Sequence, residues 1–124
     1  MPEAGSPRQN GGVNVRYRRD DAVIWAPAEH TDWIFRALVE LHERRHDLPS
    51  GIVWGDDEAH VDPVRFDTFA TAIVGEWETV GSTVYHQLVD GFVASVQVIA
   101  ERCGLELDVG DEAYALALAA RHNM

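Results

Sequence analysis

The 124-residue chain contains no lysine, a single cysteine and no long uninterrupted apolar run. Cys103 has no partner for a disulfide within the chain, which favours a reducing compartment such as the cytoplasm. The apolar stretches are much shorter than the roughly 20 residues that a membrane-spanning helix needs. The N-terminal residues also lack the apolar segment of a signal peptide. These absences predict a soluble cytoplasmic protein without a membrane partner.

Positive charge is also scarce. Ten arginines stand against 21 aspartates and glutamates, which gives a formal net charge of −11. Thirteen of the acidic residues lie between Asp56 and Glu112, where only Arg65 and Arg102 oppose them. Such a surface repels phosphates, so we expect no nucleic-acid partner. It would attract a basic partner, which leaves open an acidic antidote or inhibitor, although solubility alone also accounts for the charge.

The length predicts one domain. Residues 1–12 are mostly small and polar, and they predict a disordered tail, so the single globular domain is expected at 13–124. Apolar alternation predicts a β-hairpin, with strands at 13–17 and 23–25. Shorter strands are expected at 52–53 and 105–109.

Apolar residues at helical spacing predict four helices, at residues 28–46, 63–79, 82–103 and 111–121. Asp62 followed by Pro63 is a strong helix start, because aspartate is a good N-cap and proline suits the first helical position. The helix at 82–103 is the most apolar, and its wide apolar face indicates either a central helix or a subunit interface. The second alternative leads us to expect a homodimer. The predicted fold class is α+β, mainly α, with an N-terminal β-hairpin packed on a bundle of three to four helices.

The most specific chemical signal is the run His42-Glu43-Arg44-Arg45-His46, which has the spacing of a zinc metallopeptidase helix. Two histidines four residues apart can reach one metal ion, with Glu43 as the general base. At about 100° per residue, both histidines fall on the edge of a predicted core stripe. The centre of that stripe is formed by Ile34, Leu38 and Leu41.

A zinc-dependent hydrolase is the alternative that this run raises, and three features weaken it. The two intervening arginines oppose a bound cation, the helix ends directly afterwards, and no third ligand stands out. His60 is the first choice as a third ligand, and Glu76 and His86 are further options. Two partly buried histidines at a helix end explain the run without a metal. We therefore expect no cofactor, with zinc only under the alternative.

Three other features lead to expectations about structure. The segment 56–62 is predicted to be a solvated acidic loop. Gly91 and Ser95, one turn apart, would permit another element to approach closely. Trp33 and Trp54 are expected to be core anchors, although they could border a pocket.

The chain resembles a family of small uncharacterised actinobacterial proteins over roughly residues 13–109. The matching pieces are Val23-Ile24-Trp25 with Pro27, Pro49-Ser50-Gly51-Ile52, Asp62-Pro63 with Phe66, Gly91-Phe92, Ala100-Glu101-Arg102 and Gly104-Leu105-Glu106. The resemblance implies a hairpin followed by helices and no activity, since the family is of unknown function. The preferred interpretation is a small acidic helical protein that acts by binding or self-association, with a protein or small-molecule partner possible.

Overall fold

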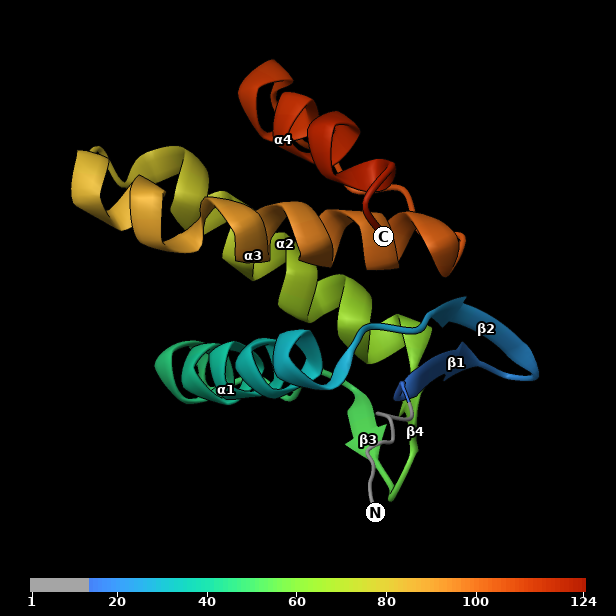
Figure 1. The fold of residues 1–124 in the computed structure, drawn as a ribbon. Coiled ribbons are helices and arrows are strands. Elements are labelled where there is room, and N and C mark those ends of the chain that lie inside the picture. The colour runs from blue at the N-terminus through green and yellow to red at the C-terminus, as the bar shows by residue number, and fades with distance from the viewer. Residues whose placement is uncertain (1–13) are drawn as a thin grey trace, which may run out of the picture.

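The computed structural model describes residues 14–124, so the predicted tail at 1–12 lies outside the described residues. The elements are β1 Arg16–Arg19, β2 Ala22–Trp25, α1 Glu29–His46, β3 Ile52–Trp54, β4 Glu58–Val61, α2 Pro63–Thr79, α3 Thr83–Arg102 and α4 Asp111–Arg121. Figure 1 shows the small sheet to one side of the helices. The predicted fold class, α+β and mainly α, is confirmed.

The four strands form one sheet in the order β2-β1-β4-β3. β1 pairs with β2 in an antiparallel hairpin, as predicted, and with β4 in parallel on its other side. β3 pairs with β4 in the antiparallel sense. The hairpin is therefore not isolated, and β4 supplies the second partner that a marginal two-stranded unit needs.

The prediction of an acidic loop at 56–62 is wrong for its second half, which is β4. Ala59 and Val61 are buried there, while Glu58 and His60 point outward. Consecutive carboxylates hide this short alternation in the sequence. The arginines of β1 compensate their charge, because Arg18 Nε donates to Glu58 Oε2 at 2.8 Å.

The strand predicted at 105–109 does not form. Leu105, Leu107 and Val109 do pack against the core, which explains the alternation that suggested a strand. The segment has no strand partner in the described part of the chain, and its ends are held by other bonds. Gly110 N–H donates to Glu78 Oε2 at 2.6 Å, and Leu105 N–H donates to Ala100 O at 2.9 Å.

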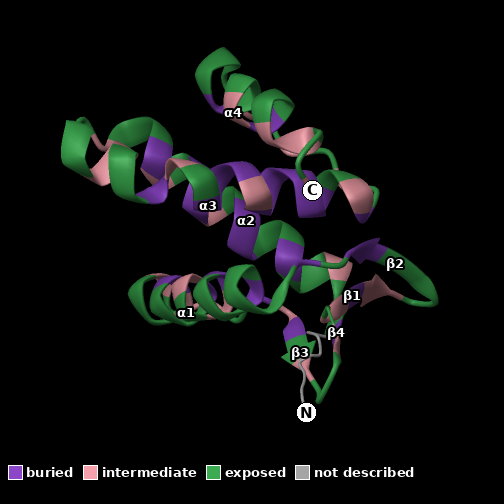
Figure 2. Cartoon of the chain, in the orientation of Figure 1, coloured by how far each residue is buried: buried purple, intermediate pink, exposed green. Residues whose placement is uncertain are grey.

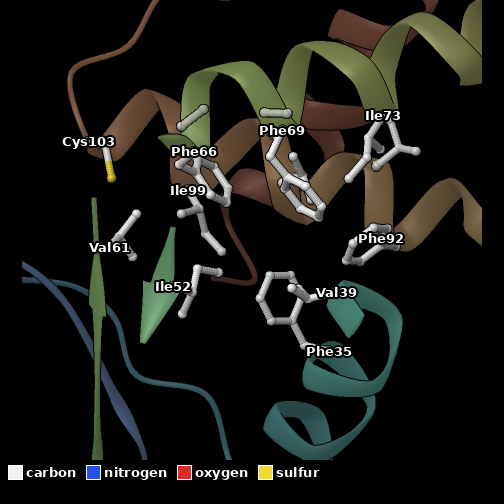
Figure 3. Packing of buried hydrophobic residues seen from close by; sticks show 14 of the residues in the cluster. Phe35, Val39, Ile52, Val61, Phe66, Phe69, Ile73, Phe92, Ile99 and Cys103 are labelled. Carbon is white, nitrogen blue, oxygen red and sulfur yellow. The ribbon is translucent and has the colours of Figure 1, made fainter. Parts of the chain in front are cut away.

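All four helices lie close to their predicted bounds. The predicted start of α2 is as expected: Asp62 is the N-cap and accepts from Val64 N–H at 3.1 Å, and Pro63 is the first residue of the helix. α3 packs against both α2 and α4, and its second half is buried on nearly every side, whereas its first half is largely exposed (Figure 2). The core forms where α1, α2, α3 and the sheet meet, as Figure 3 shows for Phe35, Phe69, Phe92 and Ile52.

α1 turns a different face to the core from the predicted one. Its buried residues are Asp32, Phe35, Val39 and His42. This face lies about 100° around the helix from the predicted stripe of Ile34, Leu38 and Leu41, a rotation of one residue. Ile34 is 60% exposed. α1 therefore has two apolar faces, one in the core and one at the surface.

No helix in residues 14–124 is long and apolar enough to cross a membrane.

Candidate functional site

The two histidines of the zinc-like run lie side by side, with His42 in the core and His46 half-buried at its edge. His42 is buried, and its Nδ1 donates to the carbonyl oxygen of Leu38 at 2.8 Å. The His42 ring stacks on Phe92 with 4.8 Å between ring centroids. His46 stacks on the outer side of His42, with centroids 6.2 Å apart and an interplanar angle of 16°. The aromatic stack explains the burial of His42.

Glu76 of α2 brings a carboxylate to this pair. Its Oε1 lies 3.4 Å from His46 Nε2, and Tyr85 O–H donates to the same oxygen at 3.3 Å. Arg45 pairs with Oε2. Burial raises the pKa of Glu76, but Arg45, His46 and Tyr85 together outweigh it and hold the pKa below its usual value. A guanidinium therefore supplies the positive charge that a metal would bring.

The other predicted site residues lie elsewhere. Glu43 accepts from Ser50 N–H at 2.8 Å, so its carboxylate holds the turn after α1. His60 lies on the outward side of β4, with its Nε2 3.7 Å from Glu58 Oε1. Within residues 14–124, no three His, Cys, Asp or Glu side chains are placed to hold one metal ion. The zinc hydrolase stays a prediction, with Glu76 rather than His60 beside the histidine pair.

The buried imidazole predicts a pH dependence of stability. Burial holds the pKa of His42 below its usual value. The unfolded state therefore binds the proton more readily, near pH 6.5, and the free energy of unfolding falls as the pH drops below that value. His42→Phe keeps a ring against Phe92 and removes the titration. Urea unfolding between pH 7.5 and 5.5 measures the free energy of unfolding of both proteins. We expect this free energy to fall more steeply with decreasing pH in the wild type than in His42→Phe, by up to about 1.4 kcal/mol per pH unit. Equal slopes for the two proteins would contradict the assignment.

A buried polar cluster beside the sheet was not predicted from the sequence. Tyr17 O–H donates to Asp32 Oδ1 at 2.6 Å and accepts from Trp54 Nε1 at 2.9 Å. Burial, and next the bond to Asp32, raise the pKa of Tyr17 above its usual value. Acidic side chains in the first turn of a helix are usually exposed, so the sequence did not predict the burial of Asp32. Its position one turn before Phe35 was the available signal for burial.

A cleft of about 720 Å³ opens next to this cluster, at the start of α1. Trp33 borders it together with several carboxylates, and Trp33 is 71% exposed, so the preferred prediction of a core anchor is wrong for this residue and the alternative of a pocket residue holds. Arg36 Nη1 lies 3.8 Å from Asp32 Oδ2. The guanidinium carbon of Arg36 lies 5.1 Å from the centroid of the Trp54 ring. The chain thus places a cation of its own in the cleft.

A second hollow, of about 450 Å³, lies between α1 and α3, and it is apolar. All ten residues that line it are uncharged. Trp25, Phe35 and Phe92 line it from the core side, where each is buried. We call this hollow, with its exposed rims at Ile34 and Leu88, the α1–α3 groove.

The rims of the α1–α3 groove are strongly exposed. Leu88 is 74% exposed, and Ile34 is 60% exposed. Gly91 and Ser95 line the groove beyond it, and the Ser95 hydroxyl donates to Gly91 O at 2.8 Å. A Cβ added at Gly91 would meet no atom of the described chain within 4 Å. The close approach predicted at these small residues is therefore not made by residues 14–124.

Comparison with known proteins places the chain in a family without adding an activity. No curated protein and no solved structure matches it. The sequence profile of a family of unknown function (DUF6086) matches residues 13–124, which confirms the predicted resemblance to a family of unknown function. The chain, whose described residues form the small sheet, helices α1 to α4 and the apolar α1–α3 groove, belongs to that family.

Proposed function

We propose that this protein acts by self-association, with the α1–α3 groove as the docking surface for a second copy. The observation that supports this most directly is the combination of an uncharged apolar groove with exposed leucine and isoleucine rims on a chain of net charge −11. Two copies repel each other over most of their surface, so an uncharged face is where they can meet at least cost. A homodimer of this kind fits the reducing cytoplasm that we propose as its compartment.

The energetic reason is the burial of apolar surface. Fully burying a leucine or isoleucine side chain contributes about 1.5–3 kcal/mol relative to leaving it exposed. Ile34 and Leu88 would each be buried twice in a symmetric dimer. A standard interface uses about 20–30 residues from each partner, which is more than the ten that line the groove. We therefore propose a dimer of micromolar affinity.

A different protein, or a small apolar molecule, is the other occupant that the sequence left open. The groove is more exposed than the enclosed cavities that bury most of a small ligand. Self-association is favoured over a different protein because it needs no component beyond this chain. In addition, the exposed side chain of Leu88 and the hollow of the α1–α3 groove lie on the same face of the molecule.

The test is a charge placed on the groove rim. Leu88→Glu should weaken the dimer by about tenfold or more, because an unpaired carboxylate would be buried against an apolar surface. The matched control is Val64→Glu, which adds the same charge at a side chain that is 76% exposed on α2 and does not line the groove. Sedimentation equilibrium at moderate salt measures the dissociation constants, and thermal unfolding verifies that both variants fold.

Two results would overturn the proposal. One is a wild-type protein that stays monomeric at about 100 µM, where a micromolar dimer is fully formed. The other is an equal loss of association in Leu88→Glu and Val64→Glu, which would attribute the effect to total charge and not to the groove.

A further inference from the structure

We infer that the cleft at the start of α1 binds an organic polycation, whose ammonium or guanidinium groups lie between the exposed ring of Trp33 and the carboxylates of the walls. A polyamine and a basic peptide both carry such groups. The residues that line this cleft include none of those that line the α1–α3 groove, so the inference does not depend on the proposed self-association.

The first argument is the charge of the cleft walls. Five of the ten lining residues are carboxylates, namely Glu29, Asp32 and Glu40 on α1 and Asp56 and Asp57 between β3 and β4. The same lining has two basic side chains, Arg36 and His30. A cleft whose walls carry mostly one sign of charge raises the local concentration of ligands of the opposite sign. The walls therefore favour a cationic ligand.

The spacing of these carboxylates indicates what kind of cation fits. Arginines of the chain pair with Asp57 and Asp32. The carboxylates without an ion pair to residues 14–124 are Glu29, Glu40 and Asp56. At about 1.5 Å per residue, Glu29 and Glu40 lie about 16 Å apart along α1, too far for one compact ion to contact both. No three His, Cys, Asp or Glu side chains of the described chain are placed to hold one metal ion. An extended chain with several cationic groups matches this spacing.

The second argument is a buried carboxylate oxygen that lacks a hydrogen bond. Asp32 is 4% exposed and lines the cleft. Tyr17 O–H donates to its Oδ1 at 2.6 Å, but no group of residues 14–124 donates to its Oδ2. Arg36 Nη1, at 3.8 Å from Oδ2, is too far for a hydrogen bond. A buried carboxylate is costly unless its oxygens have donors, and an ammonium or guanidinium group is a strong donor because its bond is charge-assisted.

The third argument is the exposed tryptophan at the border of the cleft. Trp33 is 71% exposed, whereas Trp25 and Trp77 are buried and Trp54 is half-buried. The chain already holds one cation on an aromatic ring here, since Arg36 lies within the roughly 6 Å range of a cation–π contact to Trp54. Trp33 has no such partner among residues 14–124, so its ring is open to a cation of the ligand.

Calorimetric titration of the full chain with spermidine, and separately with a tri-arginine peptide, tests the site at low salt, where exposed charges are least screened. Trp33→Leu should raise the dissociation constant about threefold or more, because the cation–π contact is lost. Trp33→Phe keeps a ring and should restore most of the affinity. Glu29→Gln combined with Glu40→Gln should raise the dissociation constant about fivefold, because two carboxylates lose their charge.

The matched control is Asp67→Asn combined with Asp108→Asn, which removes the same charge from two exposed side chains that do not line the cleft. It should change the dissociation constant by less than about twofold, since screening weakens distant charges. Tighter binding of spermidine would identify a free polyamine as the source of the cation. Tighter binding of the peptide would identify a basic protein segment.

Three results would each refute the polycation site. The first is no binding of either probe to the wild type at about 1 mM. The second is an unchanged dissociation constant in Trp33→Leu. The third is an equal loss of affinity in the glutamate pair and in the control pair, which would attribute binding to total charge. All substituted side chains are exposed, and thermal unfolding verifies that each variant folds.

Discussion

Replacing Tyr17 with phenylalanine is expected to lower the free energy of unfolding by about 3 kcal/mol. The change removes one oxygen and leaves the ring in place, so little packing is lost. It leaves Trp54 Nε1 without its acceptor and removes from Asp32 a donor at 2.6 Å. Asp32 is only 4% exposed, and its remaining charged neighbour is Arg36 at 3.8 Å. An under-satisfied buried carboxylate carries most of the cost.

Urea unfolding at pH 7.5 measures this loss, with Tyr114→Phe as the control because Tyr114 is exposed on α4. Asp32→Ala and the double variant complete a cycle, and their effects should be strongly non-additive because the two side chains share one bond. A loss below 1 kcal/mol for Tyr17→Phe would show that the cluster is not a main source of stability.

Gly51→Ala is expected to have an effect of similar size, about 3 kcal/mol, for a reason of backbone geometry. Gly51 has φ +78°, and an added Cβ would lie 2.8 Å from Arg65 Cβ and 2.9 Å from Asp62 O. The same backbone accepts a bond from Asp62 N–H at 2.9 Å. This contact holds the start of β3 against the start of α2, so neither side can move away freely.

Gly75→Ala is the matched control, because Gly75 lies within α2 and a Cβ there meets nothing within 4 Å among the described residues. It should stabilise the protein by up to about 1 kcal/mol, since alanine is the better helix former. In thermal unfolding, we expect a lower Tm for Gly51→Ala and a higher Tm for Gly75→Ala than for the wild type. A neutral Gly51→Ala would mean that the turn rearranges at little cost.

The positions of the helices could be predicted because local chemistry determines them. Asp62 and Pro63 specify the start of α2, and Gly104, with φ +83°, follows the C-cap residue of α3 at a position where glycine is favoured. These signals act within one helical turn and need no knowledge of the rest of the chain. The hairpin was predictable for the same reason, because the apolar alternation that indicates its strands is also a local pattern. In the structure, Asp20 takes the left-handed conformation, φ +52°, at its turn.

The face that each helix buries could not be predicted in the same way. On α1, hydrophobicity alone favoured Ile34 and Leu41 over Asp32 and His42, which are polar. Those two polar residues are buried because their partners, Tyr17 and Phe92, come from distant parts of the chain. A sequence pattern records the apolar residues but not whether the surface they form faces the core or a second molecule.

The candidate site was also predictable only in part. The spacing of His42 and His46 correctly placed both on one side of the helix, because that follows from helix geometry. Glu76 was one of three options for a neighbouring ligand, and only the packing of α2 against α1 selected it over His60. The α1–α3 groove was visible only in part, as an apolar stripe interpreted as core.

The parallel pairing of β1 with β4 has a consequence for how the chain folds. Arg16 is in register with Glu58, so the two strands close a loop of about 40 residues that contains β2, α1 and β3. Such distant contacts form late, because the entropy of closing the loop is lost before the pairing compensates for it. During synthesis, β1 has only β2 as a partner until residue 61 has left the ribosome. The N-terminal strands are thus made first and completed last, and one edge of β1 stays open throughout that interval.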